Sequence, residues 1–324
     1  MSNACSAVVF AYHDVGARCL RVLLAHGIDV RLVLTHDDDP RENVWFERVA
    51  DVARAYRLNV ATAVDANAGD IVSRVAACAP DFLFSFYYRA MLSRDILDTP
   101  RRGALNLHGS LLPKYRGRAP VNWAILHGES HTGATLHYMT TKADAGDIVA
   151  QQAVPILPDD TALDVFRKIT VAAEIALDGV LPALIAGTAP RLAQDLTQGS
   201  YFGGRKPEDG RIDWSKSAQQ IHNLVRAVAP PYPGAFTTVD GMQVRILRTR
   251  VMDAASPPNA SPALEIRGDR MIVRCGGGGT LAIDALEVDG APKNAAAVAA
   301  RFGGGNVPLG ASTTINTTSA MTGH

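Results

Sequence analysis

The sequence predicts an α/β protein in which an open, doubly wound sheet is followed by a second, smaller β domain. Short apolar runs alternate with amphipathic stretches through the first half of the chain, which is the pattern of strands joined by helical crossovers. Those apolar runs are continuous, as is typical of parallel strands covered on both faces. Short strand-like segments with frequent turns fill the last third, which favours a small barrel or sandwich there.

The first sheet is expected to begin with the run SAVVFAYH and to reach residue 110. The expected strands are 6–13, 30–36, 80–88 and 103–110, and the expected helices are 16–27, 43–57 and 161–187. In such sheets ligands bind outside the carboxyl ends of the strands, where the strand order changes direction. His108 lies at the end of one predicted strand, and Arg89 and Ala90 follow another. The chemistry is therefore expected at those strand ends.

A polar, irregular segment from Thr188 to Arg205 indicates a domain boundary, because few contacts cross such segments. One helix is expected after it, at 217–229, and strands are expected at 234–239, 243–252, 263–268, 270–276 and 280–288. The predicted domains are a catalytic domain at 1–190, a linker at 191–205, a second domain at 206–302 and a mobile tail at 303–324.

The composition narrows the class of protein. Lys plus Arg and Asp plus Glu number 32 each, so the chain lacks the positive surplus that is typical of nucleic-acid binding. The four cysteines have no C-x-x-C spacing and are interpreted as buried thiols of a reducing compartment. No apolar run approaches the roughly 20 residues that cross a bilayer. We therefore expect a cytoplasmic protein without membrane insertion.

Several well-known motifs are incomplete in this chain. The segment HDVGARCL lacks the three-glycine dinucleotide fingerprint, and CGGGGT lacks the Lys-Ser/Thr of a P-loop, so it is interpreted as a hairpin turn. The segment around Ser110 does not have the G-x-S-x-G spacing of a serine hydrolase. His127, His131 and His137 lack carboxylate or thiolate partners at metal-ligand spacing, and we interpret them as surface or packing residues with no metal site.

Asn106, His108 and Asp144 offer a more coherent chemistry. Asn106 and His108 are two residues apart, so on a strand their side chains point to the same side. A carboxamide N–H and an imidazolium directed at one atom would stabilise an oxyanion, and Asp144, if it reached His108, would favour the protonated ring. Singly, an Asn at a strand end and an Asp in KADAGD are more often turn formers. The pattern alone leaves both interpretations open.

A resemblance to a known family supports the catalytic interpretation. The segment NLHGSLLPKYRGRAPVNWAI, followed by TGATLHYM and KADAGDIVAQ, resembles the signature region of the formyltetrahydrofolate-dependent formyltransferases. The similarity extends to about Gly303. The segments VVFAYHD, FSFYYR and VRAVAPPYPGAF are most similar to the branch that acts on UDP-4-amino-4-deoxy-L-arabinose, which is usually the N-terminal half of a bifunctional polymyxin-resistance enzyme.

This resemblance implies a Rossmann-like doubly wound, mostly parallel sheet followed by a small OB-like β-barrel domain. It implies that Asn106, His108 and Asp144 form a catalytic trio that uses 10-formyltetrahydrofolate as formyl donor. The residues implied to hold the folate are Ala90, Met91, Leu92, Arg118, Thr140, Thr141, Lys142 and Ala143. Because the chain ends at His324, we expect a formyltransferase without a decarboxylase domain.

Three functions remain open at this stage. Formylation of the UDP-aminoarabinose amine, a step of lipid A modification, is favoured by the motifs and by the acidic segment THDDDPRENVWF, where a tRNA reader would gain from basic residues. Formylation of methionyl-tRNA is the alternative. A folate or nucleotide binder without catalysis is a third possibility.

Overall fold

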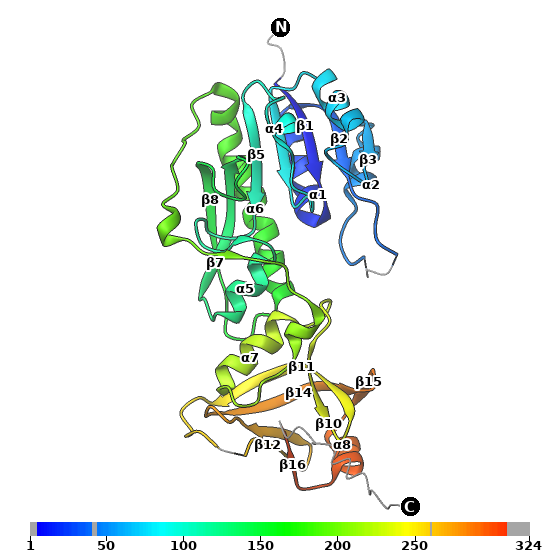
Figure 1. Ribbon diagram of the computed structural model, residues 1–324, viewed down its shortest axis with the longest axis vertical. Coiled ribbons are helices and arrows are strands. Elements are labelled where there is room, and N and C mark those ends of the chain that lie inside the picture. Colours follow the sequence, from blue (N-terminus) through cyan, green and yellow to red (C-terminus); the bar gives the residue numbers. More distant parts are fainter. Residues whose placement is uncertain (1–4, 41–43, 260, 310–324) are drawn as a thin grey trace, which may run out of the picture. The chain divides into compact units, whose positions relative to one another are not determined.

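The computed structural model describes residues 5–40, 44–259 and 261–309 (Figure 1). The chain divides into two compact units, Met1–Lys206 and Pro207–His324. The first unit contains a mostly parallel sheet with helices on it, and the second contains an antiparallel sheet that curls into a half-barrel. The predicted fold class is confirmed.

The first unit is built on one seven-stranded sheet in the order β3-β2-β1-β4-β5-β7-β8. Its strands are β1 (Ser6–Ala11), β2 (Asp29–Thr35), β3 (Val60–Thr62), β4 (Phe82–Phe86), β5 (Gly103–His108), β7 (His131–Tyr138) and β8 (Ile148–Pro155). Strands β1 to β5 are parallel, and β7 and β8 form an antiparallel hairpin beside β5. The strand order therefore changes direction between β1 and β4.

Helices cover both faces of this sheet, because each crossover must bury an apolar stripe. The helices are α1 (His13–Ala25), α2 (Val49–Ala55), α3 (Gly69–Ala77), α4 (Arg94–Leu97), α5 (Pro120–Leu126) and α6 (Ala162–Ala186). Side chains of α3 and α4 pack on Val8, Phe10, Leu32 and Leu34, which share one face of the sheet. Helix α1 contacts both α2 and α6, and these three helices cover the other face.

Helix α6 begins at a capping box, in which Thr161 and Asp164 bond each other's backbone N–H groups, and ends at Gly187 in the left-handed region. Within the described ranges it is the helix whose length and hydropathy would suffice to cross a membrane. This differs from the expectation that no such stretch exists. It packs on β7, β8 and α1, as the core helix of a globular domain does.

The second unit is an antiparallel sheet in the order β10-β11-β14-β13-β12-β16, with β15 paired to β14. Its elements are α7 (Ala218–Ala227), β10 (Ala235–Val239), β11 (Met242–Asp253), β12 (Ala263–Arg267), β13 (Arg270–Arg274), β14 (Thr280–Val288), β15 (Ala291–Lys293), α8 (Ala295–Phe302) and β16 (Asn306–Pro308). The segment CGGGGT joins β13 to β14, which confirms the predicted hairpin turn. Gly278 and Gly279 have φ of 97° and 82°, which glycine adopts without strain.

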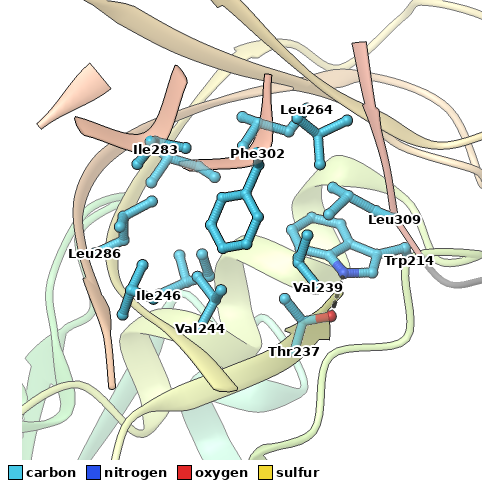
Figure 2. Close-up of a pocket in the computed structure, with 13 residues that line it drawn as sticks. Trp214, Thr237, Val239, Val244, Ile246, Leu264, Ile283, Leu286, Phe302 and Leu309 are labelled. Carbon is cyan, nitrogen blue, oxygen red and sulfur yellow. Dashed lines mark hydrogen bonds between the residues drawn. The ribbon is translucent and has the colours of Figure 1, made fainter. Parts of the chain in front are cut away.

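The interior of this unit contains a small apolar cavity of about 10 Å³ (Figure 2). Figure 2 shows the ring of Phe302 and the aliphatic side chains of Leu264, Ile283 and Leu286 around it. The indole N–H of Trp214 donates to Thr237 Oγ1 at 3.0 Å. A space of this volume holds at most one water molecule. It is part of the core.

The structure differs from the sequence prediction at the two segments expected to lack structure. In the predicted linker, Leu192 bridges Ile148 of β8, and β9 (Tyr201–Phe202) pairs in parallel with β6 (Arg116–Gly117). In the predicted tail, β16 pairs with β12. Backbone pairing holds both segments in place. The remainder of the tail, residues 310–324, lies outside the described residues.

Candidate active site

Asn106, His108 and Asp144 meet at the carboxyl end of β5. Alternate positions of the strand place the first two side chains on one side of it, and the β7–β8 loop carries Asp144. Asp144 Oδ1 lies 3.5 Å from His108 Nδ1 and 3.4 Å from Asn106 Nδ2. One carboxylate oxygen thus faces both of the other side chains. The structure brings the predicted trio together.

His108 is oriented by a backbone carbonyl as well as by Asp144. Its Nε2 lies 2.8 Å from the Tyr115 carbonyl oxygen, and since a carbonyl only accepts, Nε2 carries the hydrogen. The lone pair of the neutral ring is then on Nδ1, the nitrogen that faces Asp144. Burial lowers the pKa of His108 below its ordinary value, although Asp144 and the Tyr115 carbonyl act in the opposite direction. Asp144 favours the protonated ring as expected, but burial outweighs it.

Asp144 is held in an unusual backbone conformation. Its φ is 51°, which is the left-handed region that Asp tolerates better than most residues. Its Oδ2 accepts the Gly117 N–H at 2.8 Å, and the Gln194 amide donates to its carbonyl oxygen at 3.1 Å. A Cβ at Gly146 would lie 2.0 Å from the Tyr138 carbonyl oxygen, so the turn requires glycine there.

The charge state of Asp144 follows from these contacts. Burial alone would raise the pKa of its carboxyl group, but His108, His137 and the Gly117 N–H together lower it well below its ordinary value. The Gly117 contact is present whatever the charge of His108. Asp144 is therefore an anion throughout the neutral range.

His137, which the sequence pattern suggested to be a surface or packing residue, also contacts the trio. It is 2% exposed, and its Nε2 lies 3.2 Å from Asn106 Nδ2 and 3.5 Å from Asp144 Oδ1. It is opposite Asn106 in the antiparallel β5–β7 register, and its Nδ1–H donates to the Tyr138 carbonyl at 2.8 Å. The available signal was a histidine at the end of an apolar strand, seven residues before Asp144. His127 and His131 are exposed, as expected of surface residues.

The residues implied to hold a folate lie in two segments next to the trio and in a third loop. Met91 is 60% exposed, whereas Leu92 is 5% exposed and packs in the same apolar cluster as Met139. Leu92 and Met139 thus belong to one apolar cluster on the face of the sheet covered by α3 and α4. Ala90, Thr140, Thr141 and Lys142 are exposed, and Ala143 is half-buried. The side chain of Leu92 is unavailable to a ligand, so only its backbone can contact one.

The basic residues of the loop after β5 differ in their surroundings. Arg118 is exposed, and its backbone N–H donates to Phe202. Arg116 is buried, and Lys114 lies 3.5 Å from Glu129. Within the described ranges, no group of three or more His, Cys, Asp and Glu side chains has the arrangement of a metal site. Arg118 is the basic side chain of this loop that faces solvent without a carboxylate contact in the described structure.

Comparison with protein families identifies the class. Residues 10–181 match the formyl transferase family, and residues 205–302 match the formyl transferase C-terminal domain. The first match covers more than half of the 324 residues. The chain belongs to the formyltransferase family and is a formyltransferase.

Solved structures of similar fold include sugar formyltransferases. An N-formyltransferase from Helicobacter canadensis, in complex with folinic acid and dTDP-3-aminofucose, matches with a TM-score of 0.67 at 18% identity over 86% of this chain and 98% of its own. WlaRD, a sugar 3N-formyl transferase with dTDP and 5-N-formyl-THF, matches with a TM-score of 0.68 at 18% identity, over 90% of this chain and 98% of its own. A 4-N formyltransferase from Francisella tularensis matches with a TM-score of 0.58 at 18% identity, over 71% of this chain and 91% of its own. These likenesses establish the shared fold.

Proposed function

We propose that the protein transfers the formyl group of 10-formyltetrahydrofolate to the 4-amino group of UDP-4-amino-4-deoxy-L-arabinose. The observation that carries the proposal is the convergence of Asn106, His108 and Asp144 at the end of β5 in a chain of the formyltransferase family. The donor is supported by similar structures that contain folinic acid or 5-N-formyl-THF, and the acceptor class by those that contain dTDP or a dTDP sugar. The particular sugar rests on the sequence motifs.

The folate is assigned to the surfaces next to the trio. Thr140, Thr141, Lys142 and Ala143 precede Asp144, so a ring bound along their backbone would place its formyl group beside the carboxylate. Ala90 and Met91, with the backbone of Leu92, form the neighbouring wall. The exposed guanidinium of Arg118 suits the glutamate carboxylates of the folate, because planar N–H pairs bind carboxylates in a bidentate way.

In the proposed reaction the neutral sugar amine attacks the formyl carbon. The C–N bond that forms leaves a positive charge on the amine nitrogen and a negative charge on the former formyl oxygen. Nδ1 of the neutral His108 ring takes the amine proton, and the resulting imidazolium is stabilised by Asp144 at 3.5 Å. The Asn106 carboxamide and the imidazolium stabilise the oxyanion. The imidazolium then returns the proton to N10 of the folate as the carbon–N10 bond breaks.

Asp144 and His137 act in this scheme by holding the other two residues. Asp144 remains an anion, so it stabilises each protonated state of His108. His137 accepts one N–H of the Asn106 amide at 3.2 Å, which fixes the plane of the carboxamide. The second N–H, 3.4 Å from Asp144, turns from the carboxylate to the oxyanion as the intermediate forms. Neither residue needs to exchange a proton with the substrate.

The proposed product would serve lipid A modification and polymyxin resistance, with the enzyme in the cytoplasm. All four cysteines are free in the structure, and two of them, Cys19 and Cys275, are buried. Free thiols of this kind are typical of a reducing compartment.

The decisive experiment supplies the purified protein with 10-formyltetrahydrofolate and either UDP-4-amino-4-deoxy-L-arabinose or methionyl-tRNA. Release of tetrahydrofolate is followed by absorbance, and mass spectrometry identifies the N-formyl product. We expect turnover with the nucleotide sugar alone. Turnover with methionyl-tRNA alone would replace the proposed acceptor. Binding of the folate without any product would favour a non-catalytic binder.

A further inference from the structure

The loop between β5 and α5 provides backbone contacts to two residues of the trio. The Tyr115 carbonyl accepts from His108 Nε2 at 2.8 Å, and the Gly117 N–H donates to Asp144 Oδ2 at 2.8 Å. A carbonyl and an amide two residues apart thus fix the ring and the carboxylate. Because hydrogen bonds weaken steeply with distance and angle, the position of this loop controls the geometry of the site.

This loop does not adopt a conformation that the chain favours by itself. Tyr115 and Ala119 have φ of 57° and 53°, a region that residues with a side chain rarely adopt. Each such residue costs about 1–3 kcal/mol and persists where the surrounding structure holds it. The support must therefore come from another part of the chain.

The support comes from residues 199–203, which we name the strap. The strap lies after α6 and outside the two segments that match the family. Its Ser200 carbonyl accepts the Arg116 N–H at 3.0 Å, and its Phe202 carbonyl accepts the Arg118 N–H at 2.9 Å. The Gly203 carbonyl accepts the Trp123 indole N–H at 3.0 Å.

The strap and the loop approach too closely for side chains at two positions. A Cβ on Gly117 would lie 2.2 Å from the Phe202 carbonyl oxygen, and a Cβ on Gly199 would lie 2.5 Å from the Pro113 carbonyl oxygen. Contacts below 3.0 Å require the backbone to move. The two glycines therefore permit a continuous backbone ladder between the strap and the loop.

One side chain of the strap bonds the residue that orients His108. Ser200 Oγ accepts the Tyr115 N–H at 2.8 Å, while the carbonyl of the same Tyr115 accepts from His108. We propose that Ser200 is a positioning residue for formyl transfer, whose hydroxyl holds Tyr115 so that the Tyr115 carbonyl fixes the His108 ring. The proposal rests on the role of His108 given above. Formyl transfer would then depend on a residue outside the trio.

Removal of the Ser200 hydroxyl is expected to lower the pKa of His108. The ionisable groups that face His108 are Asp144, which raises its pKa, and His137, which lowers it, and neither contacts Ser200 in the described structure. The bond to the Tyr115 carbonyl also raises the pKa of His108. If Tyr115 shifts, this bond lengthens, and the pKa of His108 falls further below its ordinary value.

The first test compares Ser200→Ala, Ser200→Thr and Ser73→Ala in steady-state formyl transfer from 10-formyltetrahydrofolate. Ser200→Ala is expected to lower kcat about 10-fold with little change in KM for the folate, as misplaced catalytic groups do. Ser200→Thr retains the hydroxyl and should restore kcat. The Ser73 hydroxyl likewise makes a hydrogen bond to the backbone, donating to the Gly69 carbonyl at 2.7 Å in α3, so Ser73→Ala is the control and should keep the wild-type kcat.

The second test needs no acceptor. The imidazole signals of the protein labelled at histidine are followed by NMR through a pH titration, and His108 is identified by the signal missing in His108→Asn. We expect a lower His108 pKa in Ser200→Ala, and the wild-type pKa in Ser200→Thr and Ser73→Ala. This result would support the proposal even if the sugar proved to be another one. An unchanged His108 pKa in Ser200→Ala, whether or not kcat or thermal stability falls, would overturn it.

Discussion

The trio and the apolar cavity of the second unit are both recessed, and they differ in what their walls can do. Around Asp144, side chains and backbone groups from β5, β7 and two loops converge within hydrogen-bonding range, and one of them is an anion. Around the cavity of Figure 2, the described walls are aliphatic and aromatic apart from the Trp214–Thr237 bond. The proposed chemistry therefore rests on convergent polar groups and not on enclosed space.

The largest expected effect is the loss of activity when a residue of the trio is replaced. His108→Ala and Asn106→Ala each remove a proposed donor to the oxyanion, and we expect kcat to fall about 10²–10³-fold or more. His131→Ala, which changes an exposed histidine of the same unit, is the control and should retain activity. Steady-state release of tetrahydrofolate measures the effect. Wild-type turnover in either site variant would contradict the assignment of the trio.

A second change addresses the apolar region. Leu286 is 2% exposed and lines the cavity, so Leu286→Ala should lower the free energy of unfolding by about 2–5 kcal/mol through lost burial and an enlarged void. Urea unfolding followed by circular dichroism measures this loss. The kcat of the folded variant should equal that of the wild type, and a reduced kcat at full folding would show that this interior does contribute to catalysis.

The half-buried His13 and the buried His108 extend the comparison to the effect of pH. Burial, aided by Arg89, lowers the pKa of His13 to about 3, whereas at His108 the carboxylate of Asp144 acts against burial. A lowered pKa contributes stability above the unfolded value near 6.5, and this contribution is lost as pH falls toward the folded value. Between pH 7 and pH 4.5 the loss should be about 2–3 kcal/mol.

The variant His13→Gln, which cannot titrate, isolates this contribution. Its free energy of unfolding should fall less than that of the wild type between the two pH values, whereas the exposed His131→Gln should follow the wild type. Urea titrations at pH 7 and pH 4.5 provide the comparison. If the free energy of unfolding falls by the same amount in His13→Gln and in the wild type between pH 7 and pH 4.5, His13 is not held as a neutral ring.

The smallest expected effect concerns the polar bond in the apolar region. Thr237→Val keeps the shape of the side chain but leaves the buried Trp214 N–H without its acceptor, which should cost about 1 kcal/mol of stability. The exposed neighbour in Thr238→Val serves as control and should cost less. A loss of several kcal/mol would instead reveal a larger polar network around Trp214.

The sequence predicted those parts of the fold that one local pattern specifies. The apolar runs of β1, β2, β4 and β5 were recognised because strands covered on both faces have a distinctive composition. The antiparallel β7 and β8 were not predicted, since β8 is an edge strand that mixes buried and exposed residues. Helix α8, with its run of alanines, was missed for a similar reason, because it has a narrow apolar stripe.

At the site, too, features set by a local pattern were predictable from the sequence, and features set by pairing between distant segments were not. The spacing of Asn106 and His108 predicts a shared side of the strand, and the structure agrees. His137 joins them only through the β5–β7 register, which depends on pairing between distant segments. The Tyr115 carbonyl that orients His108 is a backbone group, and every residue has one. Its role follows from the path of the chain and has no sequence signature.

The strap also determines how the chain can be divided for expression. A fragment that ends at residue 190, the boundary suggested by composition, would lack the carbonyl and hydroxyl acceptors for Tyr115, Arg116 and Arg118. Such a fragment would keep all three residues of the trio and lose the ladder that shapes the loop beside them. A catalytic fragment of this enzyme must therefore extend to Lys206, where the first compact unit ends.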